Sequence, residues 1–80
     1  MLTLSERERL FDELILQQKK KMLALARLFI PHIIEDDLLQ PFDFQELERN
    51  APFRYEEGVL EGLLTARMAI AAAEHDTIII

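Results

Sequence analysis

The scarcity of chain-breaking residues is the feature that most constrains this fold. The 80-residue chain has two glycines and three prolines, and the first of these, Pro31, follows thirty residues that contain neither. Hairpin turns and barrel corners depend on glycine and proline at fixed positions. Half of the residues are apolar, which suffices for a folded domain. We therefore predict an all-α fold, formed as a single helical domain over residues 1–80.

The first predicted helix spans residues 5–30. Capping-box patterns begin at both Thr3 and Ser5, each with a glutamate three residues later. The start is therefore predicted only to within two residues. Pro31 disfavours helical geometry at the residue before it, which predicts the end of the helix.

The apolar residues of this helix form two stripes when residues are placed at about 100° intervals. The first stripe has Gln18 in its middle and contains Leu4, Phe11, Leu14, Ile15, Met22, Leu25 and Phe29. The second stripe lies roughly 120° away and contains Leu16, Leu23 and Ile30. Since a second antiparallel helix covers only one stripe, the other predicts a further packing partner.

The predicted connector, residues 31–51, holds a short helix over residues 44–49. Asp43 is the expected N-cap because a glutamate follows three residues later. Phe42 and Leu47 have the spacing of a hydrophobic staple around that cap.

The last helix is predicted over residues 52–75, with Asn50 or Ala51 as N-cap and Pro52 at its first position. Its two apolar stripes are Phe53, Leu60, Leu64 and Ala71, and Val59, Leu63, Ala66 and Ile70. An apolar tail, residues 77–80, is expected either to pack on the protein or to be followed by more chain.

Two further features of the last helix predict packing. Small residues recur along one side, at Gly58, Gly62, Ala66, Ala69 and Ala73. Glycine within a helix costs about 0.8–1 kcal/mol relative to alanine, so this row predicts close approach of a neighbouring helix. Glu56, Arg67 and Glu74 project into the apolar arc, where charges are costly unless paired. We expect them to extend past apolar neighbours or to bridge between helices and set their register.

The charge distribution restricts the classes of partner. The chain has a net charge of −6, and residues 35–61 alone hold nine acids against two arginines. Such an acidic body predicts no nucleic-acid partner. No segment approaches the roughly 18 apolar residues that a membrane span needs, and the N-terminus has no signal-peptide pattern. We therefore expect no membrane partner and a cytoplasmic location.

Catalytic groups are nearly absent from the sequence. There is no cysteine, and the single serine is better explained as a helix cap. No nucleophile–base pair or glycine-rich phosphate loop is recognisable. We predict that the chain is not an enzyme, with no catalytic residues and no cofactor.

The acidic connector raises the alternative of a small metal-binding protein. His32, Glu35, Asp36 and Asp37 carry metal-ligating groups, but their spacing matches neither zinc nor calcium motifs. Helix capping explains the same residues, since Asp36 or Asp37 would cap a turn within residues 33–39. We therefore predict no metal site.

Four of the six aromatic residues, Phe42, Phe44, Phe53 and Tyr55, cluster around the connector. They are expected to plug the space between the long helices, with an exposed docking patch as the alternative.

These features predict a helical hairpin of two long antiparallel helices joined by the connector. Pairing of two copies into a four-helix bundle would cover the remaining stripes. The predicted function is a self-associating adaptor, cochaperone or structural subunit whose partner is itself or another protein. The candidate interface residues are Leu16, Leu23, Ile30, Gly58, Gly62, Ala66, Ala69, Phe44 and Tyr55.

The order of a long helix, a connector and a helix bearing Gly58 and Gly62 within an alanine-rich sequence resembles the small helical-hairpin cochaperones of type III secretion systems. The resemblance is one of size and layout. It implies a heteromeric chaperone-like subunit that would place the same stripes on a different protein.

Overall fold

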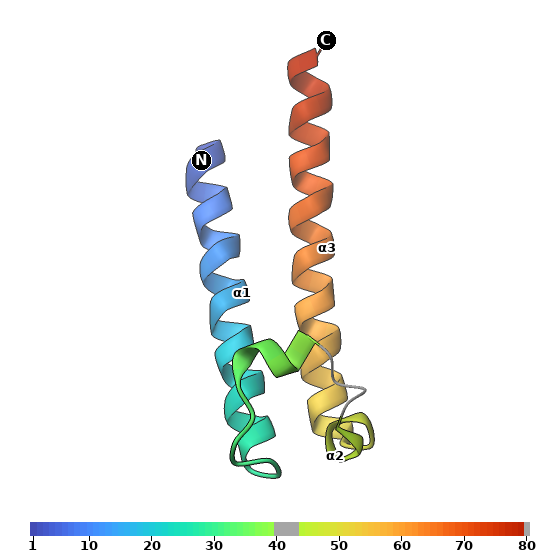
Figure 1. Cartoon of the computed structure of the whole chain (residues 1–80). Helices are drawn as coiled ribbons and strands as arrows, with labels where there is room; N and C mark the ends of the chain where they lie inside the picture. The colour runs from blue at the N-terminus through green and yellow to red at the C-terminus, as the bar shows by residue number, and fades with distance from the viewer. Residues whose placement is uncertain (40–43, 80) are drawn as a thin grey trace.

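Two long helices pack against each other, and a connector closes one end of the pair (Figure 1). The computed structural model describes residues 1–39 and 44–79, without the side chains of residues 39 and 75–79. Its elements are α1 (Leu4–Arg27), the short 3-10 helix η1 (Glu35–Leu39), α2 (Gln45–Glu48) and α3 (Ala51–Ile79). The described residues contain no strand. The predicted all-α fold with two long packed helices is therefore confirmed.

Helix α1 begins one residue earlier than its predicted range, because Thr3 is the cap. The Thr3 hydroxyl oxygen accepts the backbone N–H of Glu6 at 3.2 Å, and the hydroxyl donates to the Glu6 carboxylate at 2.9 Å. Of the two candidate capping boxes, the structure therefore uses the one at Thr3.

The end of α1 at Arg27 lies three residues before the predicted end. The N–H groups of Leu28 and Phe29 bond to carbonyls only three residues back, which tightens the last turn. The chain then bends, and Arg27 Nε donates to the carbonyl of Ile33 at 3.2 Å. Pro31 thus sets only the last residue at which α1 could end. The helix ends earlier, and the chain turns back so that Ile33 is buried in the core.

The two short helices of the connector differ in how their starts are capped. The Asp37 carboxylate accepts the N–H of Ile34 at 3.0 Å, so one of the two predicted carboxylates caps the turn within residues 33–39. The N-cap of α2 is Phe44, with no capping bond from its side chain, so the prediction of Asp43 was wrong. Asp43 and Phe42 lie outside the described residues, as does the predicted staple.

Helix α3 begins one residue earlier than predicted, at Ala51, and ends later. Asn50 Oδ1 accepts the N–H of Phe53 at 2.9 Å, which identifies Asn50 as the cap and puts Pro52 at the second helical position. The helix continues to Ile79, so most of the predicted tail is helical. No glycine or proline follows Gly62 to end it earlier.

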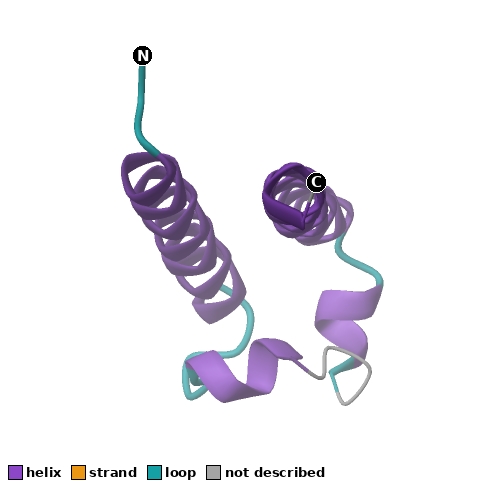
Figure 2. Cartoon of the chain, turned by 90° about the horizontal axis from the view of Figure 1, so that it is seen from above, coloured by secondary structure: helices purple, strands orange, loops and turns teal. Residues whose placement is uncertain are grey.

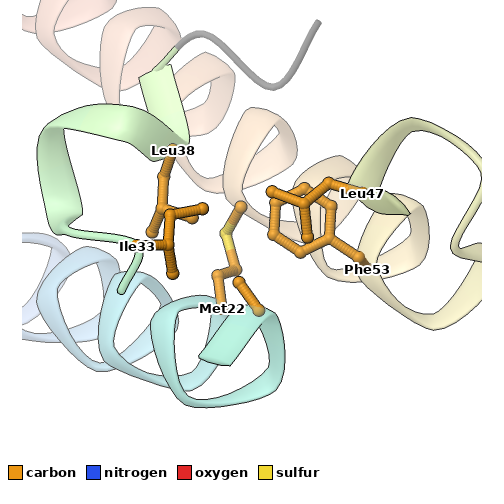
Figure 3. Close-up of a cluster of buried hydrophobic side chains, with 6 residues drawn as sticks. Met22, Ile33, Leu38, Leu47 and Phe53 are labelled. Carbon is orange, nitrogen blue, oxygen red and sulfur yellow. The ribbon is translucent and has the colours of Figure 1, made fainter. Parts of the chain in front are cut away.

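The hydrophobic core lies at the closed end of the hairpin, where the connector covers it. Four large side chains are almost fully enclosed, namely Met22, Ile33, Leu47 and Phe53 (Figure 3). Ala26 and Leu38 complete the cluster, and Phe44 packs against it half-buried. The plug prediction is therefore confirmed for Phe53. Tyr55 is 71% exposed and does not belong to the plug.

Candidate interaction surface

Polar side chains link the two long helices along most of their shared length. Each of the three charged residues predicted in the apolar arc of α3 pairs with α1. The pairs are Arg7 Nη2 with Glu74 Oε1 at 2.8 Å, Asp12 Oδ1 with Arg67 Nη2 at 2.8 Å, and Lys21 Nζ with Glu56 Oε1 at 3.1 Å. The expectation that these residues bridge between helices is confirmed.

The Gln18–Glu56 contact is the buried part of this set. Gln18 Nε2 donates to the Glu56 carboxylate Oε2 at 2.7 Å and to the Glu56 backbone carbonyl at 2.8 Å. Both residues are buried. The hydrogen bond from Gln18, followed by the interaction with Lys21, lowers the pKa of the Glu56 carboxyl below its ordinary 4.5. Because a slipped register would leave these groups without partners, the pair favours one alignment of the helices.

The lowered pKa of Glu56 predicts acid sensitivity. A carboxyl with a depressed pKa in the folded state stabilises the protein above its unfolded pKa, and this contribution is lost as pH falls through the folded pKa. We expect wild type to melt at a higher temperature than Glu56→Gln at pH 7, and the difference to shrink as pH falls below 4.5. Melting curves between neutral and acid pH test this. The exposed Glu61→Gln is the control, and a gap for Glu56→Gln that does not change with pH would contradict the prediction.

The connector lies on one side of the two long helices (Figure 2). It forms a small pocket of about 180 Å³, whose lining includes Lys19 of α1, Leu38 of η1 and Leu60 of α3. Lys19 and Leu60 therefore mark the connector side of each long helix.

The opposite side of the hairpin, which we call the far face, presents exposed apolar and small residues, together with Gln17 and Lys21 of α1. On α1, Leu10 and Leu14 precede Lys19 by nine and five residues, which places them about 180° and 140° around the helix from it. On α3, Gly62 and Ala66 follow Leu60 by two and six residues, about 160° and 120° around. Its apolar and small residues include Leu10, Leu14, Val59, Gly62 and Ala66, all of which are solvent-exposed. A Cβ added at Gly62 would meet no atom within 4 Å.

A second apolar surface, the open-end groove, lies between the N-terminal half of α1 and the C-terminal half of α3. It has a volume of about 320 Å³, and its apolar lining includes Leu4, Phe11, Leu64 and Met68. The Arg7–Glu74 ion pair lies in its wall without hydrogen-bond geometry. Among the described residues, Arg7 Nε and both Glu74 carboxylate oxygens are buried with no hydrogen-bond partner.

The predicted interface residues do not share one face. Leu23 and Ile30 are half-buried and pack against the core cluster, so the chain itself covers much of the second stripe of α1. Leu16 remains 49% exposed. Phe44 belongs to the edge of the core.

The small residues of α3 are all exposed. Gly58, Gly62, Ala66 and Ala69 do not approach α1 closely, contrary to a packing role within the hairpin. As contacts with a second molecule, they stay predictions. Leu10 was not among the predicted interface residues, and Leu14 was assigned to the stripe that the second helix was expected to cover. Leu10 and Leu14 are four residues apart beside that stripe, and this helical spacing could have indicated that they share an exposed face.

The described acidic residues of the connector do not form a recognisable metal centre. His32, Glu35 and Asp36 are exposed, and Asp37 caps η1. Among the described side chains, those of residues 1–38 and 44–74, no group of three or more from His, Asp and Glu is arranged to hold a metal ion. In the same part of the chain, no helix is both long and apolar enough to cross a membrane.

Comparison with protein-family models, with curated proteins and with solved structures found no match. The function must therefore be inferred from the surfaces of this chain. Their main features are a small core at one end, the far face, and the open-end groove between the two long helices.

Proposed function

We propose that this chain is a non-enzymatic protein-interaction module that self-associates, with two hairpins pairing into a four-helix bundle. The observation that carries the proposal is the character of α3. Its residues 58–73 contain two charged side chains, Glu61 and Arg67, and the second of these pairs with Asp12. A helix that is apolar around most of its circumference is normally enclosed by neighbours, whereas this stretch is largely exposed.

The surface area of the chain supports a missing partner. A compact monomer of 9.4 kDa exposes about 5,000 Å², and this chain exposes 6087 Å². The excess of roughly 1,000 Å² is similar to the ~800 Å² that each partner buries in a standard protein–protein interface. Burial of about 800 Å² by each copy would bring the area that one chain exposes close to that of a compact monomer of the same mass.

A heteromeric chaperone-like subunit is the second candidate, and the open-end groove favours it. A groove with apolar walls and the Arg7–Glu74 ion pair beside them fits the apolar face of an amphipathic helix from a different protein. This candidate differs from self-association in what the purified chain does alone. It predicts irregular aggregation without a defined oligomer.

Self-association predicts that thermal stability rises with protein concentration. Because folding and assembly are linked, the dimer is favoured by mass action and the melting temperature increases as the chain is concentrated. Melting curves recorded by circular dichroism over a hundredfold concentration range measure this shift. A melting temperature that does not depend on concentration would contradict the proposal.

A further inference from the structure

We infer that the far face is the dimer interface, and that Leu14 and Leu10 of each copy pack over Gly62 and Ala66 of the second copy. This inference rests on the proposed self-association and specifies its geometry. The connector occupies the other side of the helix pair near its closed end, so a second hairpin can pack along the full length of both long helices only across the far face (Figure 2).

The far face is suited to a protein partner because none of its α3 residues between 58 and 73 is charged, and its α1 part presents Leu10 and Leu14, with Glu13, Gln17 and Lys21 at their edges. Leu10 and Leu14 are 45% and 38% exposed, and Val59 is 36% exposed. The excess accessible area of the chain is large enough for a standard interface.

The interhelical pairs set the heights of these residues along the hairpin. Asp12 pairs with Arg67 and Gln18 with Glu56, and Leu14 lies between the two pairs. Counting one residue of α3 for each residue of α1 from either pair places Leu14 level with residues 60–65 and Leu10 level with residues 64–69. Each of these leucines therefore has a small residue of α3, Gly62 or Ala66, within about one helical turn of its own height.

This pairing of heights selects one symmetry. A two-fold axis parallel to the long helices keeps every residue at its height and packs α1 against α3 of the second copy, so that leucines meet Gly62 and Ala66. An axis perpendicular to the helices would pack α1 on α1 and α3 on α3. Leucine would then face leucine between the two copies of α1, which would hold these helices apart. Glycine would face glycine between the two copies of α3, which would leave a void there.

Cysteine cross-linking tests the contact directly, because the chain has no cysteine of its own. Leu14→Cys and an isotope-labelled Gly62→Cys are refolded together and oxidised mildly, and each variant is also oxidised alone. We expect the mixed disulfide to form at least about tenfold faster than either self-disulfide, because only the mixed pair is held together. Self-disulfides that form faster than the mixed one would overturn the inference in favour of the perpendicular axis.

Exchanging the sizes of the side chains at positions 14 and 62 tests the same contact without cross-linking. Gly62→Leu should overpack the interface and raise the dimer dissociation constant by roughly 5- to 150-fold, with no loss of helix content. Leu14→Ala combined with Gly62→Leu moves the large side chain to the other helix and should restore the constant to within about tenfold of wild type. Leu14→Ala alone is the control, and circular dichroism verifies folding.

The possible failures are distinguishable. A dimeric wild type in which Gly62→Leu has no effect, or in which the double variant stays monomeric while folded, overturns the far-face contact and leaves self-association intact. A wild type that is monomeric in light scattering overturns both.

Discussion

Replacing Phe53 by alanine is expected to lower the free energy of unfolding by about 3–5 kcal/mol. Phe53 is fully enclosed at the centre of the core, between the connector and α1. A domain of 80 residues has a total stability of roughly 4–12 kcal/mol. The variant should therefore lose a large share of the total stability, as measured by urea denaturation monitored by circular dichroism.

Tyr55 provides the matched control for Phe53. It is an aromatic residue on the same helix, but it is 71% exposed. At a protein concentration low enough for the monomer to dominate, Tyr55→Ala should change stability by no more than about 0.5 kcal/mol. Phe44→Ala should fall between the two, since Phe44 is half-buried against the core. Equal losses for Phe53→Ala and Tyr55→Ala would contradict the assignment of Phe53 to the plug.

The second large effect is expected in the connector itself. Ile33→Ala should cost about 2–5 kcal/mol, because Ile33 is 1% exposed and packs under α1. Its neighbour Ile34 is 53% exposed, so Ile34→Ala should cost less than about 1 kcal/mol. Urea denaturation of both variants compares two adjacent isoleucines with opposite burial. Similar small losses in both would show that the connector is a surface loop and not part of the core.

Several structural features that depend on interactions between residues close in sequence were predicted correctly. The cap at Asn50, the candidate cap at Thr3 and the existence of both long helices follow from local hydrogen bonding and periodicity. The bridging role of Glu56, Arg67 and Glu74 followed from the cost of an unpaired charge in an apolar arc.

Features that depend on tertiary packing were not predictable in the same way. The end of α1 depends on where Ile33 finds its place in the core, and Pro31 sets only the outer limit. Leu23 and Ile30 are covered by the connector. The apolar periodicity of the helices gives no information about the path of that connector. The side on which the connector lies decides which helix faces stay open, and this is why Leu10 was overlooked.

The mass of the wild-type chain in solution tests the central claim most directly. Multi-angle light scattering after size exclusion, on samples loaded at hundreds of micromolar, separates the three possible results. Self-association predicts a discrete species of about twice the 9.4 kDa chain mass. A discrete species at 9.4 kDa under these conditions, or broad aggregates with no defined mass, would contradict it.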